Sequence, residues 1–272
     1  MWILIALIVV VIFFFLFRHH KKLKLGDVCC FTGGVKTGKS TLALWYARKV
    51  YKKNLFRWRI KNFFSKVFRR KEVEKPLFYS NIKLACDYVP MTREIFLREV
   101  RIAYKSVCFV DESSLIADSQ DWRDKNINEK LKMFNKLYGH ESRGGTLVYD
   151  TQTMRDNHYA IKRCMNTYIW IHHAIKWIPF VYVCRVREMF YSEDGEAVNV
   201  SDSDVENQLM WLVISKKIWK TFDCYTYSCF TDDLPVADSV VHGSRSDLKT
   251  PYLVDLCERN KEVIKIENKT KA

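Results

Sequence analysis

The feature that most constrains this chain is the glycine-rich segment at residues 33–40, GGVKTGKS. The segment matches the pattern GxxxxGK[ST] without a mismatch. An apolar, β-branched stretch at 26–32 precedes it, and a stretch of helical composition at 41–53 follows it. Strand, glycine loop and helix in this order predict a phosphate-binding loop, in which backbone N–H groups and the positive end of the helix face the phosphates.

The residue types in this loop also predict its ligands. Lys39 is expected to reach the β- and γ-phosphates of ATP, and the Ser40 hydroxyl is expected to ligate Mg²⁺. An ordinary glycine turn does not explain the Lys-Ser pair. ATP and Mg²⁺ are therefore the expected cofactors. The expected nucleotide-binding residues are Gly33, Gly34, Val35, Lys36, Thr37, Gly38, Lys39, Ser40 and Thr41.

Two carboxylates, Asp111 and Glu112, follow the apolar stretch CFV at 108–110. Asp111 is expected to hold Mg²⁺ through water, and Glu112 to orient or deprotonate the attacking water. Acidic residues at a strand end that are merely solvated are the ordinary alternative. A glutamate directly after the aspartate favours a hydrolase over a phosphoryl-transfer kinase.

Two further candidates flank the apolar stretch at 146–150. Gln152 follows it, at the strand end that faces the ligand in a parallel α/β sheet, and is expected to sense the γ-phosphate or position the water. A helix-capping turn is the alternative. Arg143 lies in the preceding turn at 140–145 (HESRGG) and is a candidate arginine finger for a neighbouring subunit. The alternative for Arg143 is a surface salt bridge.

Strand-like and helix-like stretches alternate along the chain. This alternation predicts an α/β fold, a P-loop NTPase with a mostly parallel layered sheet. The ATPase domain is expected at 26–200, followed by C-terminal strands and a polar charged tail at 201–272. A hairpin is expected at 193–195 (EDG). The expected strands lie at 26–32, 77–80, 107–111, 146–150, 168–171 and 181–190, and the expected helices at 41–53, 92–104, 128–138 and 154–165.

Residues 2–17 form an unbroken apolar run of sixteen residues. As a helix the run would span about 24 Å, slightly less than a hydrocarbon core of about 30 Å, and the basic side chains after it can cover the difference. We expect residues 1–25 to form one transmembrane helix with a basic juxtamembrane segment. A cleaved signal peptide is the alternative, although no cation precedes the run and no A-x-A-like site follows it. The residues that directly follow the run include Arg18, His19, His20, Lys21, Lys22 and Lys24.

Because these cations lie only after the run, the positive-inside rule places the N-terminus outside and the ATPase domain in the cytoplasm. The formal net charge of +14 indicates nucleic acid or anionic lipid as a partner. The nine cysteines include no CxxC pair, which favours reduced thiols and gives no sign of a zinc site.

A basic amphipathic segment is expected at 54–75. Its apolar residues recur at helical spacing, with cations mostly on other faces. A helix lying on a membrane surface fits this pattern, single-stranded DNA is the rival ligand, and a helix packed on the core is the third reading. The apolar positions are Phe56, Ile60, Phe63, Phe64, Val67 and Phe68.

Residues 26–190 resemble the N-terminal ATPase domain of the zonula occludens toxin family, which are assembly ATPases of filamentous bacteriophages related to the FtsK and HerA DNA motors. The similarity is carried by the phosphate loop, YSNI at 79–82, Asp111-Glu112, and the turn at 140–145 that leads into a strand ending in Thr151-Gln152. The resemblance implies a motor for phage assembly or single-stranded DNA export at the membrane of a bacterial host. It also implies a homo-oligomeric ring and phage assembly proteins as partners. A nucleotide-binding scaffold or switch without translocation remains an alternative, as does a DNA-packaging or conjugation ATPase of another lineage.

Overall fold

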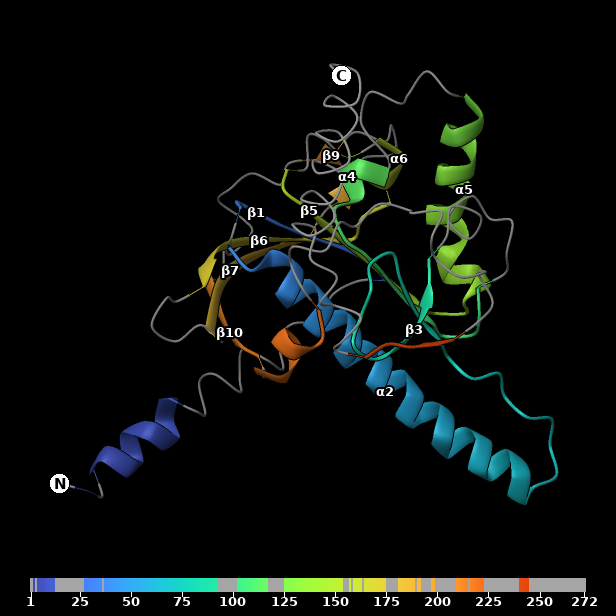
Figure 1. Ribbon diagram of the computed structural model, residues 1–272, viewed down its shortest axis with the longest axis horizontal. Helices are drawn as coiled ribbons and strands as arrows, with labels where there is room; N and C mark the ends of the chain where they lie inside the picture. Colours follow the sequence, from blue (N-terminus) through green and yellow to red (C-terminus); the bar gives the residue numbers. More distant parts are fainter. Residues whose placement is uncertain are drawn as a thin grey trace, which may run out of the picture.

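The computed structural model shows one layered α/β body, in which helices cover both faces of a twisted sheet (Figure 1). The residues it describes are 2, 4–12, 27–35, 37–91, 102–116, 125–153, 157, 159–162, 164–174, 181–188, 190–191, 197–198, 209–214, 216–222 and 240–244.

Nine strands of this described part form the sheet, in the order β10-β7-β6-β1-β5-β4-β2-β3-β11. The six central strands, from β6 to β3, pair in parallel, whereas β7, β10 and β11 are antiparallel additions at the edges. The expected mostly parallel sheet is thus confirmed. The strands are β1 (Val28–Gly33), β2 (Phe78–Ser80), β3 (Asp87–Pro90), β4 (Val107–Val110), β5 (Thr146–Thr151), β6 (Thr167–Ala174), β7 (Val181–Glu188), β10 (Leu209–Val213) and β11 (Val241–His242).

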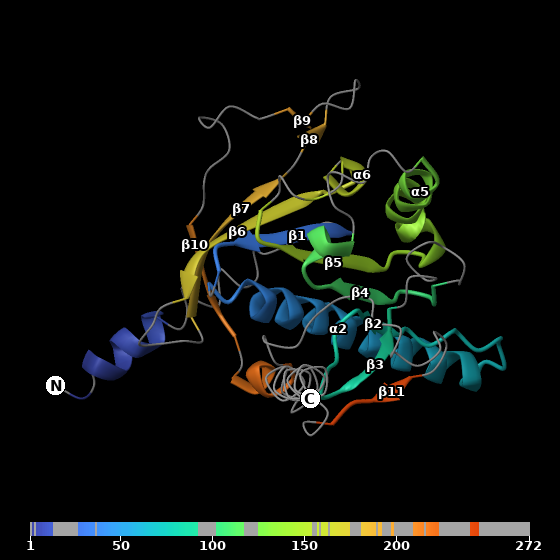
Figure 2. The ribbon, with the colours of Figure 1, turned by 45° about the horizontal axis from the view of Figure 1, so that its top comes forward.

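The hydrophobic core has two layers, one on each face of the sheet. One face of the sheet packs against α2 (Lys39–Val67) and the 3-10 helix η2 (Lys216–Lys220), where Leu42, Leu44 and Ile218 are buried. The other face packs against α5 (Lys125–Glu141) and α6 (Tyr159–Lys162), where Phe134 and Tyr138 are buried. A short helix, α4 (Ser113–Ile116), follows β4. Figure 2 shows α2 below the sheet and α5 and α6 above it.

Several expected elements differ from those observed. The segment at 54–75 is not a separate insert, because α2 continues without a break from the phosphate loop to Val67. Of the helix expected at 154–165, the structure describes only α6. Residues 102–104 of the helix expected at 92–104 are not helical, and the rest lies outside the described residues. Strand β3, which ends in a proline, was not anticipated from the sequence.

The hairpin expected near residue 194 is present. Strands β8 (Phe190–Tyr191) and β9 (Ala197–Val198) pair antiparallel, while residues 193–195 themselves lie outside the described part. Part of the segment at 201–272 extends the main sheet, because β10 pairs with β7 and β11 with β3. The described cysteines 29, 30, 86, 108 and 164 are free thiols, as expected.

At the N-terminus, residues 4–12 are helical and their side chains are exposed. The remainder of the apolar run, at 13–17, lies outside the described residues. Within the described ranges, no helix combines the length and the apolar character needed to cross a bilayer.

Candidate functional site

The phosphate loop occupies the turn between β1 and α2, where the sequence pattern predicted it. A side chain at Gly33 would have its Cβ 2.8 Å from the Ile171 carbonyl oxygen of neighbouring β6, so only glycine fits. Gly38 caps the helix with φ 82°, in the left-handed region that glycine adopts without strain. Thr37 closes the loop, because its hydroxyl donates to the Gly34 carbonyl at 2.8 Å. The two glycines therefore allow the loop to lie against β6 and turn into the helix.

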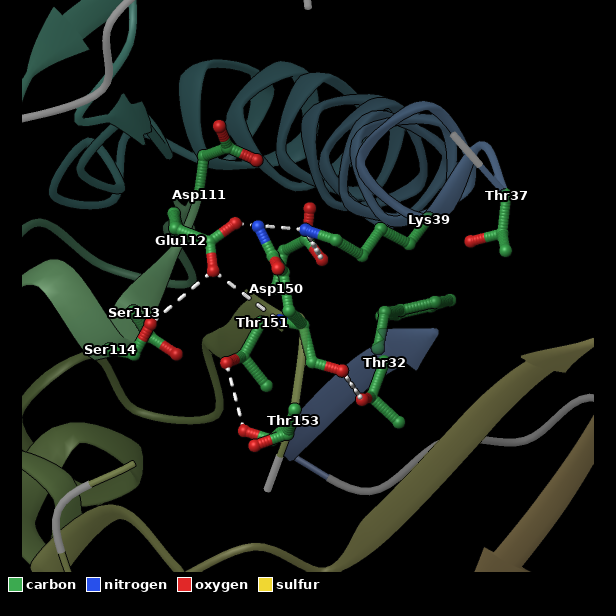
Figure 3. Close-up of polar contacts among 12 residues, drawn as sticks. Thr32, Thr37, Lys39, Asp111, Glu112, Ser113, Ser114, Asp150, Thr151 and Thr153 are labelled. Carbon is green, nitrogen blue, oxygen red and sulfur yellow. Dashed lines mark hydrogen bonds and ion pairs between the residues drawn. The ribbon is translucent and has the colours of Figure 1, made fainter. Parts of the chain in front are cut away.

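Lys39, the first residue of α2, is directed at two carboxylates (Figure 3). Its Nζ lies 3.0 Å from Glu112 Oε2 and 3.3 Å from Asp150 Oδ1. Burial lowers the pKa of Lys39, but the negative charges of Asp150 and Glu112 outweigh burial, so that its pKa lies above the usual value. The loop lysine is therefore held as a cation inside the site.

The strand order explains why these residues meet. Strand β5 lies between β1 and β4 and is parallel to both. The carboxyl ends of the three strands consequently lie at one edge of the sheet, which is where open α/β sheets bind ligands. Glu112 comes from the end of β4 and Asp150 from the end of β5, and Lys39 begins the helix after β1.

Asp111 is positioned through its backbone by Asn81. The Asn81 side chain donates to the Asp111 carbonyl at 2.9 Å and accepts from the Asp111 N–H at 2.8 Å. The Asp111 Oδ1 atom is buried and makes no hydrogen bond within the described residues. Asn81 is thus a positioning residue that sequence reasoning missed, although it lies in the YSNI segment at 79–82.

Glu112 has φ 47°, a left-handed conformation that is uncommon for residues other than glycine. One carboxylate oxygen reaches Lys39, and the other accepts from the Ser114 hydroxyl at 3.3 Å and from the Gln152 N–H at 3.4 Å. The site therefore orients Glu112 from three directions.

Gln152 lies directly after β5, at the same edge as Glu112. Its carbonyl accepts from the Thr32 hydroxyl at 2.9 Å, which ties the ends of β5 and β1 together. Gln152 itself is exposed. The structure therefore brings Gln152 beside Glu112, while its action on a γ-phosphate stays a prediction.

Asp150 is the carboxylate that the sequence analysis did not single out. It is fully buried, and its polar contact in the described part is the ion pair of Oδ1 with Lys39 Nζ at 3.3 Å, without hydrogen-bond geometry at either oxygen. Burial raises the pKa of Asp150 well above its ordinary value, the charge of Asp111 raises it further, and Lys39 opposes both. A cation such as Mg²⁺, or a change in what Lys39 contacts, would alter this balance directly.

We predict that Asp150→Asn stabilises the nucleotide-free protein at neutral pH. Because the pKa of Asp150 is raised in the folded state, its protonated form contributes stability that is fully present below the unfolded-state value of 3.8 and is lost as pH rises through the raised value. The free energy of unfolding of wild type minus that of Asp150→Asn should therefore fall with rising pH, by at most about 1.4 kcal/mol per pH unit. Denaturant titrations across pH test this.

The exposed Glu129→Gln on α5 serves as the control for loss of one carboxylate far from the site. If the difference in free energy of unfolding between wild type and Asp150→Asn does not change with pH, ionisation of the buried Asp150 does not destabilise the protein.

The residues at the site fit Mg²⁺ bound together with a nucleotide. Among the described residues, no group of three or more His, Cys, Asp or Glu side chains could hold a metal alone. Mg²⁺ needs only one or two protein oxygens when phosphates and water complete its shell. Asp111, whose Oδ1 is buried without a hydrogen bond, and Ser40 in the first turn of α2 supply such oxygens.

The other residues expected at the site make fewer of these contacts or lie away from it. Ser40 and Thr41 are partly buried in the first turn of α2, Val35 is 70% exposed, and Lys36 lies outside the described residues. Arg143 is exposed in a turn with φ 50°, before the amino end of β5. Since β5 is six residues long, about 20 Å of strand separates this turn from the carboxylate edge. The structure does not bring Arg143 to the site of its own chain.

Comparisons with known proteins gave structural neighbours only. No family model matches the chain, and no curated protein matches it. It is similar to the N-terminal domain of zonular occludens toxin from Neisseria meningitidis, at 11% identity over 74% of this chain and 100% of that chain, with a TM-score of 0.45. It is also similar to the genome packaging NTPase B204 from Sulfolobus turreted icosahedral virus 2, in complex with ATP-gammaS, at 13% identity over 60% of this chain and 92% of that chain, with a TM-score of 0.31.

The first neighbour bears the name of the family that the motifs resemble. At these scores the likeness carries no conclusion about activity. The class of protein is instead indicated by three features of the structure. They are a mostly parallel sheet, a GxxxxGKS loop between β1 and α2, and acidic residues at the ends of β4 and β5. These features define the arrangement of a P-loop nucleotide-binding protein.

Proposed function

We propose that this chain is a membrane-anchored P-loop ATPase that drives filamentous phage assembly by moving single-stranded DNA. The observation that best supports ATP hydrolysis is the contact between Lys39 Nζ and Glu112 Oε2 at 3.0 Å. Beside it lies Asp111, whose backbone is held by two hydrogen bonds to Asn81. The direction toward phage assembly rests on the motif resemblance and on the net charge of +14.

In this proposal, ATP replaces the carboxylates as the partner of Lys39. The β- and γ-phosphates lie in the loop, and Lys39 turns from Glu112 and Asp150 to the phosphates. Glu112, released from the lysine, is then free to orient or deprotonate the attacking water, next to Gln152. Mg²⁺ held by Ser40 and, through water, by Asp111 would supply charge neutralisation on the phosphates.

The pairing of Lys39 with Glu112 also bears on the rival function, a nucleotide switch or scaffold. A pure switch can dispense with Glu112, whereas a hydrolytic motor needs it. The test is steady-state phosphate release by the full chain with Mg²⁺ and ATP, with and without circular single-stranded DNA. Stimulation by the circle supports the motor. Nucleotide binding without turnover would favour the switch, and stimulation by duplex DNA alone would favour a packaging or conjugation ATPase.

The anchor is the apolar run at 2–17, with the cations after it placing the domain in the cytoplasm. A reporter fused after Ala272 should therefore read as cytoplasmic in a bacterial host. Protease added outside intact cells should leave the ATPase domain whole. Cleavage of the domain from outside would refute this orientation.

The active form is proposed to be a homo-oligomeric ring in which Arg143 acts on the neighbour's γ-phosphate. Its place before the amino end of β5, about 20 Å of strand from the carboxylate edge, argues against action in cis and supports action in trans. An arginine finger is worth about 10³–10⁵ in rate. Arg143→Ala and Lys39→Ala proteins should each be inactive, yet their mixture should recover partial turnover, because each supplies what the other lacks.

Phosphate release by co-assembled mixtures measures this recovery. Normal turnover by Arg143→Ala protein, or no recovery in a ring that contains both variants, would rule out this arginine as the finger.

A further inference from the structure

The last part of α2 leaves the body of the protein. The buried Asn54 fastens the helix to the body, with its Nδ2 donating to the Lys105 carbonyl at 3.0 Å. Beyond it, residues 55–67, here called the α2 tip, extend away from the sheet (Figure 1). Thirteen helical residues correspond to about 20 Å. The α2 tip therefore presents most of its circumference to the surroundings.

One side of the α2 tip is covered by the chain that returns from it. The partly buried residues Leu55, Trp58, Asn62 and Ser65 recur at three- and four-residue intervals, which places them on one side of the helix. The Trp58 indole N–H donates to the Val73 carbonyl at 2.7 Å and so fastens the returning segment to this side. One side of the α2 tip is thus held by the returning segment, and the opposite side faces the surroundings.

The opposite side carries a continuous exposed apolar stripe. Its members are 43–64% exposed despite their size. The rings pack on one another, with Phe64 and Phe68 stacked at 6.4 Å between centroids and Phe63 edge-on to Phe64 at 5.7 Å. The reading of this segment as a helix packed on the core is therefore wrong. The stripe consists of Phe56, Ile60, Phe63, Phe64, Val67 and Phe68.

Cations flank the stripe on both sides. At about 100° per residue, Arg57 and Lys61 lie along one border and Arg59 and Lys66 along the other. More cations follow the helix end. Residues 54–75 contain eight Lys or Arg against two Glu. Of the two acids, Glu72 pairs with Lys66 at 3.2 Å. The stripe therefore lies inside a strongly positive border.

We propose that the α2 tip is a membrane-surface element that inserts its apolar stripe into the interface of an anionic phospholipid bilayer. Aromatic residues in the interface and cations on lipid phosphates are the chemistry that such a surface recognises. Single-stranded DNA fits less well, because bases stack on separate aromatic faces along a groove. Here three of the four rings pack on one another along a convex ridge that also includes the aliphatic Ile60 and Val67. The proposal does not depend on ATP hydrolysis.

Because the apolar run at 2–17 can itself attach to vesicles, the test needs a local readout. Hydrogen–deuterium exchange of the full chain is followed by mass spectrometry on peptides within 55–71. Vesicles of phosphatidylglycerol and phosphatidylcholine should slow exchange in these peptides by at least ~10-fold, because insertion suppresses local opening of the helix. Phosphatidylcholine vesicles alone and a single-stranded oligothymidylate should not.

Variants separate the apolar from the charged contribution. Phe63→Ser combined with Phe64→Ser should abolish the protection, and each of Arg57→Gln and Lys61→Gln should reduce the protection of peptides within 55–71 about fivefold. Met133→Ser on α5 is the matched control, because Met133 is also an exposed apolar residue among lysines, and it should change nothing. Unchanged exchange in peptides from β4 and β5 reports an intact fold.

Three outcomes would overturn the proposal. Protection by the oligothymidylate and not by vesicles would assign the α2 tip to DNA. Protection that grows with protein concentration without vesicles would assign it to a second copy of the chain. Equal protection in the Phe63→Ser, Phe64→Ser protein would show that the stripe does not insert.

Discussion

Lys39→Ala protein is expected to lose ATP hydrolysis by about 10²–10³-fold or more and to bind ATP weakly. The lysine begins α2 directly after the phosphate loop and pairs with Glu112 and Asp150 in the described structure. With ATP bound, we expect it to neutralise charge that spreads over the transferred phosphoryl group. Its removal also leaves Glu112 and the buried Asp150 without their shared partner. Phosphate release and fluorescent-nucleotide titration measure the two effects.

Lys49→Ala is the matched control for this substitution. Lys49 belongs to the same helix, but its Nζ lies over the Trp45 ring at 5.0 Å and not at the phosphate loop. Its replacement should leave turnover near the wild-type rate. Unchanged turnover in purified Lys39→Ala protein would contradict the assignment of the site.

Glu112→Gln is expected to retain ATP binding and to lose turnover by at least ~10²-fold, the range for removal of a general base. The amide keeps the shape of the side chain and its reach toward Lys39, but it does not accept a proton from water. Single-turnover phosphate release, compared with nucleotide affinity, separates the chemical step from binding.

Glu129→Gln on α5 is a control for the loss of one exposed carboxylate away from the site. Hydrolysis by Glu112→Gln protein at the wild-type rate would reduce Glu112 to an ordinary strand-end acid. The motor proposal would then lose its main support, and the nucleotide switch would become the better account.

Local patterns predicted the site well because the chemistry requires a fixed spacing. The loop at 33–40 forces glycine where β6 approaches and lysine at the start of the helix, so β1 and the start of α2 could be placed from sequence. The pair Asp111 and Glu112 ended an apolar strand as expected. Helical periodicity in the stretch at 128–138 predicts four inward residues, of which Leu131, Phe134 and Tyr138 are buried and Leu137 is half-buried.

Long-range relations were not predictable in the same way. Asp150 reads as part of an apolar strand, and its closeness to Lys39 depends on β5 lying between β1 and β4. The clamp by Asn81 likewise requires the pairing of β2 with β4. The short strand β3 carries a proline, which weakens a strand signal. Composition predicts a separate segment at 54–75 after the helix at 41–53, although no glycine or proline interrupts α2 before its end at Val67.

The most direct test of the proposed ATP site is an experimental structure of the full chain with Mg²⁺ and a non-hydrolysable ATP analogue. We expect the β- and γ-phosphates inside the loop at 33–40, with Lys39 Nζ on the phosphates and no longer at 3.3 Å from Asp150. Mg²⁺ should lie between Ser40 and Asp111, and Glu112 should face the γ-phosphate. A nucleotide bound elsewhere, or one bound while Lys39 keeps its ion pairs with Asp150 and Glu112, would contradict the proposed site.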